Sequence, residues 1–366
     1  MKKIVVFHPA LAPYRLDFFN SIHKSFNAKF YFSESNVPTQ KFNQDSLKSQ
    51  ANFKINFLNK GFTIKRRVFR FGILNILKND KPDIVLVSEF GPVTISTYLH
   101  KFLFFNKIKI YTICDDSVDI AKDCKGLRRL LRNYFVSRLD GIVFTNKEVS
   151  DWYSSNLNMN AKSLIFPIIR DELIFKEKLT KSLEISREII DKHQLKDKKC
   201  LLYVGRLVEV KNLESLIKAV DLVSNEISDF RLLMVGSGED EVRLKELSKS
   251  LRLTNEIIFI GRKEGNELLA YYNVSNTFIL PSYYEPFGAV VNEALISGSY
   301  VLCSNKAGAK SLIKKGVNGD VFDPFDIETM AKLIIENTQY PNLIISNSNM
   351  LENYEETFIN FIKKMN

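Results

Sequence analysis

The sequence predicts an α/β protein built from two doubly wound, Rossmann-like domains, and three observations lead to this prediction. A chain of 366 residues corresponds to two or three domains at about 100–200 residues each. Short apolar runs such as residues 3–7 (KIVVF) and 83–87 (DIVLV) alternate with longer segments of helical spacing, a pattern typical of a covered parallel sheet. Residues 1–170 hold 27 basic and 13 acidic residues, whereas residues 171–366 hold 25 and 29, which favours a boundary near residue 170.

The first domain is expected over residues 1–169, where the chain passes through strands and helices in alternation. Helical spacing is evident over residues 16–26, 67–77 and 125–138, and further apolar runs predict strands at 28–32, 54–57, 108–113 and 141–144.

The second domain is expected over residues 170–347 and follows the same scheme. Strands are predicted at 199–204, 231–235, 257–260, 277–280 and 300–303, with helices at 213–220, 240–249, 266–272, 290–296 and 310–313. Residues 348–366 are expected to form a helix that returns to the first domain. Ligands of such sheets bind at the carboxyl ends of the strands, so the cleft between the two domains is the expected active site.

Composition excludes several classes of protein. The hydrophobic fraction of 45% is that of a globular chain, and no apolar run reaches the length of about 18 residues that a membrane span needs. The apolar run at residues 4–7 is too short for a signal peptide, so a cytoplasmic location is expected. The cysteines and histidines show no metal-ligand spacing, and therefore neither a metal ion nor another cofactor is expected.

The net charge of +10 is concentrated in two basic stretches of the first domain, residues 60–71 and 122–138. Basic residues that alternate with apolar ones suit an anionic membrane surface, and a peripheral location on the inner face of the cytoplasmic membrane would follow. Solvated amphipathic segments are the alternative. Nucleic acid is not an expected partner, because no nucleic-acid-binding motif accompanies the charge. The candidate membrane-facing residues are Lys65, Arg66, Arg67, Arg128, Arg129 and Arg132.

Two glycine-containing loops follow predicted strands of the second domain. Gly205 and Arg206 follow the strand at 199–204, and Lys211 lies five residues after Arg206. An arginine and a lysine at a strand end can bind a diphosphate, although such cations can equally be solvated. The loop that begins at Gly236 lacks the third glycine of a dinucleotide fingerprint, and a tight turn is the alternative interpretation.

The most informative segment is residues 281–294, PSYYEPFGAVVNEA. Glu285 is expected in a loop after a strand, and Glu293 within the following helix. The amides of residues 287–289 would lie at the helix N-terminus, which favours an anion. Two carboxylates that flank an anion site suit a ligand with a phosphate between two polyols, such as a nucleotide sugar. Two solvated glutamates are the alternative.

These segments resemble those of the family-4 retaining glycosyltransferases, which have GT-B architecture. The resemblance covers residues 200–325 and consists of YVGRL-x3-K, VGSGE, FIGR and PSYYEPFG-x4-E, in that order. It implies that Glu285 contacts the hydroxyls of the donor sugar and that Glu293 holds the ribose. The remaining residues to which it gives a donor-side role are Arg206 and Lys211 at the diphosphate, Arg262 near the base, and Gly205, Gly236, Phe287, Gly288 and Ala289 in the donor loops.

The resemblance also implies a reaction. The enzyme would move a hexose-type sugar from a UDP- or GDP-sugar, with retention of configuration and without a metal, to a saccharide or a polyprenyl-diphosphate-linked acceptor. Residues 8–15 resemble a subgroup that assembles capsule, O-antigen or other bacterial surface polysaccharides. The sequence departs from the family where an acidic residue is common, at Ser311, and where a His-Asp pair is common, at residues 114–116.

The first domain supplies the acceptor-side candidates. An inverting enzyme would need a general base there, and Asp115 ranks first, ahead of Asp116, Asp119, Glu89 and His8. His8, Tyr14, Arg15 and Glu89 are expected on the acceptor side. Two other classes stay open: a nucleotide-sugar epimerase of the same fold, and a basic membrane-binding or nucleic-acid-binding protein.

Overall fold

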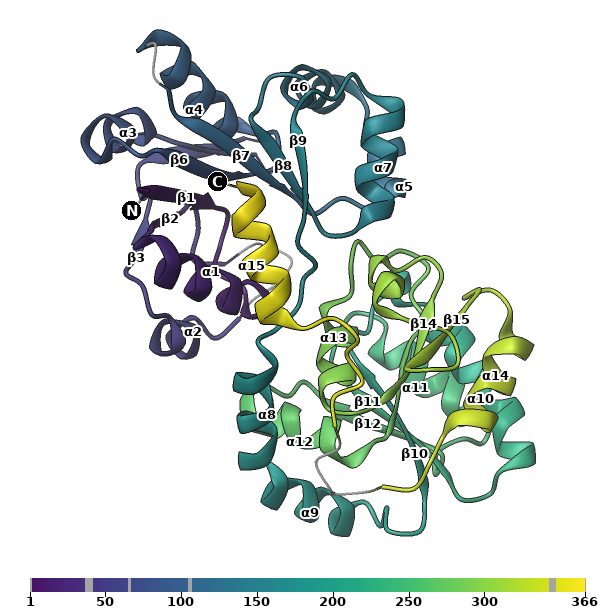
Figure 1. Ribbon diagram of the computed structural model, residues 1–366. Helices are drawn as coiled ribbons and strands as arrows, with labels where there is room; N and C mark the ends of the chain where they lie inside the picture. Colours follow the sequence, from purple (N-terminus) through teal and green to yellow (C-terminus); the bar gives the residue numbers. More distant parts are fainter. Residues whose placement is uncertain (1, 37–41, 65–66, 105–106, 342–346, 366) are drawn as a thin grey trace. The chain divides into compact units, whose positions relative to one another are not determined.

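The computed structural model describes residues 2–36, 42–64, 67–104, 107–341 and 347–365. The chain forms two compact units, which are described in turn (Figure 1). Unit 1 consists of Met1–Ile168 together with Glu356–Asn366, and unit 2 consists of Ile169–Glu355. Among the described residues, no helix combines the length and the apolar character that crossing a membrane requires.

Unit 1 is built on a seven-stranded parallel sheet in the order β3-β2-β1-β6-β7-β8-β9. The chain order reverses between β1 and β6, which are hydrogen-bonded neighbours, so the loops that follow these two strands leave the sheet side by side. The strands are β1 (Ile4–His8), β2 (Lys29–Phe32), β3 (Ile55–Phe57), β6 (Ile84–Ser88), β7 (Lys109–Cys114), β8 (Gly141–Phe144) and β9 (Lys162–Ile165).

Helices cover both faces of this sheet (Figure 1). On one face, α15 packs against α1, where Phe361 lies 5.5 Å from Phe18 and 5.4 Å from Phe166 between ring centroids. Helices α3, α4 and α6 cover the other face. The helices of the unit are α1 (Pro13–Phe26), α2 (Gln44–Gln50), α3 (Ile73–Asp80), α4 (Pro92–Leu103), α5 (Val118–Lys122), α6 (Gly126–Val136), α7 (Lys147–Asn156) and α15 (Tyr354–Met365).

The structure corrects the helix expected at residues 67–77. Its first part is a strand, β5 (Arg67–Arg70), which pairs antiparallel with β4 (Gly61–Ile64). Phe62 and Phe69 face each other across the pair and stack at 5.1 Å between centroids. Cross-strand aromatic pairs of this kind stabilise a hairpin. Helix α3 begins only at Ile73. It follows Gly72, whose φ of +92° is a left-handed conformation that favours glycine and separates the strand from the helix.

Unit 2 contains a six-stranded parallel sheet in the order β12-β11-β10-β13-β14-β15. Its chain order reverses between β10 and β13, so the loops after these strands emerge next to each other. The strands are β10 (Lys199–Val204), β11 (Phe230–Val235), β12 (Ile257–Gly261), β13 (Thr277–Leu280), β14 (Tyr300–Ser304) and β15 (Gly319–Phe322).

The core of unit 2 lies between this sheet and helices α10 and α14. Leu201, Leu232 and Leu302 of the sheet are fully buried with Leu216 of α10 and Met330 of α14. Residues 310–313, which were expected to be helical, fall in and just after the 3-10 turn η2 (Gly308–Leu312). The other helices are α8 (Glu172–Lys181), α9 (Leu183–Lys192), η1 (Glu209–Lys211), α10 (Leu213–Glu226), α11 (Glu241–Ser250), α12 (Gly265–Val274), α13 (Ala289–Ile296) and α14 (Ile327–Asn337).

Candidate active-site residues

In unit 2, the loops after β10 and β13 are joined at the point where the strand order reverses. The ammonium of Lys211, at the end of η1, forms an ion pair with Glu285 in the loop after β13. The backbone N–H of Tyr283 donates to Val210 O at 3.2 Å, and the Asn212 side chain donates to Pro281 O at 3.3 Å. These contacts bring together two predicted site residues that lie 74 positions apart in the sequence.

Glu293, on α13, is held by two partners that sequence reasoning did not identify. Its Oε1 pairs with the Arg170 guanidinium at 3.2 Å, and its Oε2 accepts a hydrogen bond from the Tyr272 hydroxyl at 3.1 Å. The neighbouring Asn292 side chain accepts from the Arg170 backbone N–H at 2.8 Å. Burial, reinforced by the charge of Glu293, raises the pKa of Tyr272 well above its usual value, so its hydroxyl stays a donor.

Helix α13 begins beside Glu285. Gly288 has a φ of +99°, and a Cβ at this position would lie 2.7 Å from Leu280 Cδ2, so both backbone conformation and space require glycine. The helix starts at Ala289. Phe287 O accepts from Ala309 N at 2.7 Å, which ties the loop after β14 to the same place. The N-terminal amides of α13, Glu285 and Lys211 therefore belong to one group of loops.

The two glycine-containing loops of unit 2 pack directly on each other. Leu207 N donates to Ser237 O, and Asp240 N donates to Leu207 O, both at 3.0 Å. Gly236 has a φ of +153°, and a Cβ there would overlap the Gly205 carbonyl oxygen. The glycines are explained by this close approach of two backbones, which is the tight-turn interpretation.

Two further predicted cations lie at strand ends with exposed side chains. Arg206 follows β10, and its own carbonyl oxygen accepts a hydrogen bond from the buried Tyr203 hydroxyl at 2.8 Å. Arg262 follows β12 and pairs with Glu264, with the Nε to Oε1 distance at 3.0 Å.

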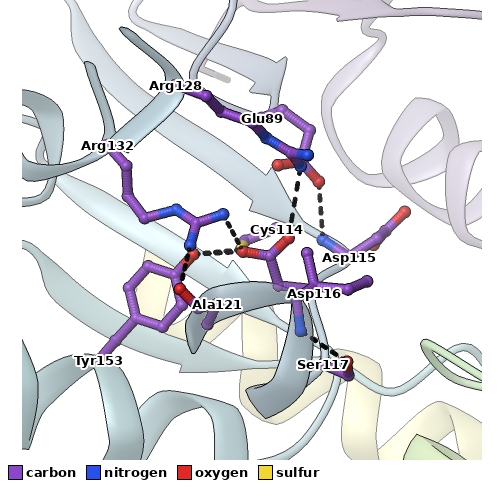
Figure 2. A network of polar contacts seen from close by, with 10 residues as sticks. Glu89, Cys114, Asp115, Asp116, Ser117, Ala121, Arg128, Arg132 and Tyr153 are labelled. Atoms are coloured by element: carbon purple, nitrogen blue, oxygen red, sulfur yellow. Dashed lines mark hydrogen bonds and ion pairs between the residues drawn. The ribbon is translucent and has the colours of Figure 1, made fainter. Parts of the chain in front are cut away.

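Unit 1 contains a second polar network, at the carboxyl ends of β6 and β7 (Figure 2). Asp116 is buried, and its carboxylate lies 2.5 Å from the Arg132 guanidinium and 3.6 Å from that of Arg128. The Tyr153 hydroxyl donates to Asp116 at 2.5 Å and accepts from the Cys114 thiol at 3.4 Å. The Asp116 carboxylate is therefore held by two guanidinium groups and one hydroxyl of unit 1.

Glu89 and Asp115 lie beside that network (Figure 2). Glu89 has a φ of +60°, an unusual conformation for a glutamate, and its carbonyl oxygen accepts from the Thr94 and Thr112 hydroxyls at 2.8 and 2.6 Å. The Asp115 backbone N–H donates to Glu89 Oε1 at 3.1 Å. The Asp115 side chain, about one third exposed, forms an ion pair with the buried Arg15 of α1.

The electrostatics of these groups differ from those of free side chains. Burial and the nearby charges of Asp116 and Asp115 raise the pKa of Glu89 to about 8, so Glu89 is mostly protonated at neutral pH. Burial and the charge of Arg15 lower the pKa of His8 to about 4, and the imidazole is therefore neutral. Burial also raises the pKa of the Cys114 thiol, which excludes a reactive thiolate at neutral pH.

The acceptor-side candidates from the first strand and helix surround one corner of unit 1. The His8 ring shares a hydrogen bond with Ala10 O at 2.8 Å and meets the edge of Phe19 at 5.2 Å between centroids. Tyr14 meets Phe42 edge to face at 6.4 Å. Arg15 of α1 forms an ion pair with Asp115, so α1 is connected to the loop after β7.

The structure corrects one of the predicted membrane-facing residues. Arg132 is only 1% exposed, because its side chain turns inward to Asp116 and to Ala121 O. Arg128, four residues earlier on the same helix face, also reaches Asp116 but stays largely exposed, and Arg129 is exposed. Lys65 and Arg66 lie outside the described residues, and so does the side chain of Arg67.

Three potential metal-ligand atoms, on Glu89, Cys114 and Asp116, lie within 4.8 Å of one another. The guanidinium groups of Arg128 and Arg132 already neutralise Asp116, and the thiol and the Glu89 carboxyl are protonated at neutral pH. A bound cation would have to compete with two fixed positive charges and displace two protons.

Comparison with known proteins gives consistent matches. Residues 185–356 match the family model described as glycosyl transferases group 1, which accounts for a little under half of the chain. An uncharacterised glycosyltransferase of Haemophilus influenzae is 32% identical over 58% of this chain and 57% of its own length. The capsular polysaccharide biosynthesis glycosyltransferase CapM of Staphylococcus aureus is 25% identical over 64% of this chain and 61% of its own. The chain thus spans less than two thirds of the length of these relatives.

A solved structure extends the similarity to the whole chain at the level of the fold. Anabaena HepE, crystallised with UDP-glucose, superimposes with a TM-score of 0.73, covering 100% of this chain and 99% of HepE, at 14% identity. The predicted GT-B fold of two Rossmann-like parallel-sheet units is confirmed by this likeness and by the two sheets. The family model and the curated relatives that match this chain are all those of glycosyltransferases.

Proposed function

We propose that this chain is a retaining glycosyltransferase that moves a hexose-type sugar from a UDP- or GDP-sugar to a hydroxyl of a saccharide or lipid-linked saccharide. The observation that carries the proposal is the grouping of Lys211, Glu285 and the α13 N-terminus in the segment that matches the glycosyl transferases group 1 model. Cations and helix amides at a strand end suit a diphosphate, and carboxylates suit sugar hydroxyls.

Each residue has a role in this proposal. The ammonium of Lys211 and the guanidinium of Arg206 bind the diphosphate, and Glu285 accepts hydrogen bonds from hydroxyls of the donor sugar. Glu293 accepts from the ribose hydroxyls, and its Arg170 and Tyr272 contacts hold the carboxylate in position. Arg262, exposed after β12, lies toward the base.

The chemistry is a same-face displacement. The bond between the anomeric carbon and the diphosphate oxygen breaks, the acceptor oxygen bonds to the anomeric carbon, and a diphosphate oxygen takes the acceptor proton. Lys211, Arg206 and the α13 amides stabilise the negative charge that develops on the diphosphate, which is electrostatic catalysis. Two side-chain cations thus take the place of a metal ion, and activity should survive a chelator.

On the acceptor side, we propose that His8, Tyr14, Arg15, Glu89 and Asp115 meet the saccharide, since they gather at the carboxyl ends of β1, β6 and β7. Asp115 is the proposed base if the enzyme inverts, because Asp116 is occupied by Arg132 and Tyr153. The similarity to CapM, a capsular polysaccharide biosynthesis glycosyltransferase, supports a place in bacterial capsule or other surface-polysaccharide synthesis. A cytoplasmic location would give access to the nucleotide sugar.

Thermal-shift measurements with UDP-, GDP-, ADP- and dTDP-sugars, followed by product analysis, test the proposal. One nucleotide sugar should raise the melting temperature, because a ligand that binds only the folded state stabilises it. Lys211→Ala should lower donor turnover by about 100-fold or more, a typical loss for one electrostatic contact to the reacting group. The matched control is Lys218→Ala, since Lys218 pairs with Glu214 on the exposed face of α10 in the same unit.

Three results would overturn parts of the proposal. No shift with any nucleotide sugar would exclude a donor site. An epimerised donor in the absence of acceptor would favour an epimerase of the same fold over a transferase. A product with inverted anomeric configuration, seen by NMR, would exclude the same-face mechanism.

A further inference from the structure

Helix α4 presents apolar side chains on the side that faces away from the sheet. Ile95, Leu99, Phe102 and Leu103 are all exposed, and Phe102 is 68% exposed. Their spacing of four, three and one residues places them along one stripe of the helix. Thr94, Thr97 and His100 are buried instead. A surface helix of a soluble protein normally has the opposite arrangement, with its apolar side inward and its polar side outward.

The elements on both sides of α4 extend this apolar stripe. Strand β5 and helix α3 contact α4 on one side, and Phe62, Ile64 and Phe71 of the hairpin region are exposed there. On the other side, Tyr98 of α4 meets Tyr134 of α6 at 5.9 Å between centroids. Leu127, Leu130 and Tyr134 form a second exposed stripe on α6, with Leu130 66% exposed. We call the surface formed by the β4–β5 hairpin, α3, α4 and α6 the outer face; Figure 1 labels these three helices.

The outer face is also strongly basic. The elements that form it, Gly61–Ile64, Arg67–Arg70, Ile73–Asp80, Pro92–Leu103 and Gly126–Val136, contain seven lysines and arginines and one acidic residue, Asp80. Some of these cations serve the fold, such as Arg132 at Asp116 and Lys101 at Asp140. Exposed cations nevertheless remain across the surface: Lys60, Lys78, Lys107, Lys125 and Arg129.

We propose that the outer face docks on a lipid bilayer that contains anionic lipids. Exposed aromatic and leucine side chains would enter the boundary between headgroups and acyl chains, while the surrounding lysines and arginines would contact anionic headgroups. A second copy of this chain fits less well, because a symmetric contact would place one net-basic surface against another. The inference rests on the surface alone and is independent of the proposed sugar transfer.

Vesicle co-sedimentation of the full chain tests this proposal. The wild type should bind vesicles of phosphatidylglycerol and phosphatidylethanolamine and should bind phosphatidylcholine vesicles at least about tenfold less well. Phe102→Ser combined with Leu130→Ser should lower the partition coefficient on the anionic vesicles by about tenfold or more, since two apolar side chains that the bilayer would bury are lost. The control is Leu173→Ser combined with Val242→Ser, two apolar residues of unit 2 that are 79% and 69% exposed.

A charge variant separates the electrostatic contribution to vesicle binding from the apolar one. Lys125→Glu combined with Arg129→Glu should also release the protein, whereas Lys196→Glu combined with Lys249→Glu, exposed residues of unit 2, should not. The proposal is overturned if the wild type stays in the supernatant with anionic vesicles, or if the Phe102 and Leu130 variant binds them like the wild type. A wild-type dimer in sedimentation equilibrium that this variant dissociates would assign the outer face to self-association instead.

Discussion

Replacing Arg132 by alanine should destabilise unit 1 severely, although the sequence suggests an exposed position for this residue. The Arg132 side chain is buried, as is that of its partner Asp116, at 2.5 Å. Removal of one partner of a buried ion pair costs about 3–5 kcal/mol, because the buried Asp116 carboxylate would keep only the more distant Arg128 guanidinium, at 3.6 Å. Ala121 O also loses its 3.0 Å donor. At roughly 2–4 °C per kcal/mol for a unit of this size, the melting temperature should fall by roughly 6–20 °C.

The assay is thermal and urea unfolding of the full chain, followed by circular dichroism. Arg129→Ala is the matched control, since Arg129 is exposed on the same helix, and it should change the free energy of unfolding by less than about 0.5 kcal/mol. Replacing both partners, as Asp116→Asn with Arg132→Met, should recover part of the loss, because no uncompensated charge stays buried and Tyr153 keeps an acceptor. Equal stability of Arg132→Ala and Arg129→Ala would refute the inward orientation of Arg132.

Two pH dependences follow from the shifted groups of unit 1. The pKa of Glu89 is raised from 4.5 in a free side chain to about 8 in the folded protein. Between these two values the folded state binds more protons than the unfolded state. The free energy of unfolding should therefore fall by on the order of 2–4 kcal/mol from pH 5 to pH 8. Glu89→Gln should flatten this slope in urea unfolding at a series of pH values, and an unchanged slope would contradict the shift. The pKa of His8 is lowered to about 4, so stability should fall by on the order of 2–3 kcal/mol from pH 7 to pH 4, and His8→Asn should remove that acid-side loss. If His8→Asn lost stability from pH 7 to pH 4 more steeply than the wild type, the neutral His8 imidazole would not be the origin of the loss.

The strands that the sequence identifies are those whose apolar residues are consecutive. Residues 83–87 become β6 (Ile84–Ser88), and residues 199–204 become β10 (Lys199–Val204), because a strand covered on both faces needs apolar side chains at every position. The β4–β5 hairpin was missed because its strands lack such runs. Residues 67–70 (RVFR) place two arginines around two apolar residues, a pattern that over so few positions also fits a helix.

The donor-side candidates could be located from local motifs, whereas their partners could not. Lys211, Glu285 and Glu293 follow strands whose positions were predicted, and the motif spacing identifies them without coordinates. Arg170 lies 123 residues before Glu293, and nothing in the surrounding sequence marks it as the partner of that carboxylate. Contacts of this separation depend on the order of the strands in the sheet, which local patterns do not specify.

The basic helix α6 shows why a charge pattern alone cannot assign a surface. The four-residue spacing of Arg128 and Arg132 correctly placed them on one helix face, but that face turns to Asp116 at the end of β7, and a buried carboxylate requires a cation there. The residues that remain outside are Leu127, Leu130 and Tyr134 together with Arg129. The basic residues of this helix therefore serve two purposes: the inward pair stabilises unit 1, and the outward residues contribute positive charge to an apolar surface. The two purposes predict different phenotypes. Arg132→Ala should lower stability without a specific effect on vesicle binding. Arg129→Glu should weaken vesicle binding and leave stability nearly unchanged.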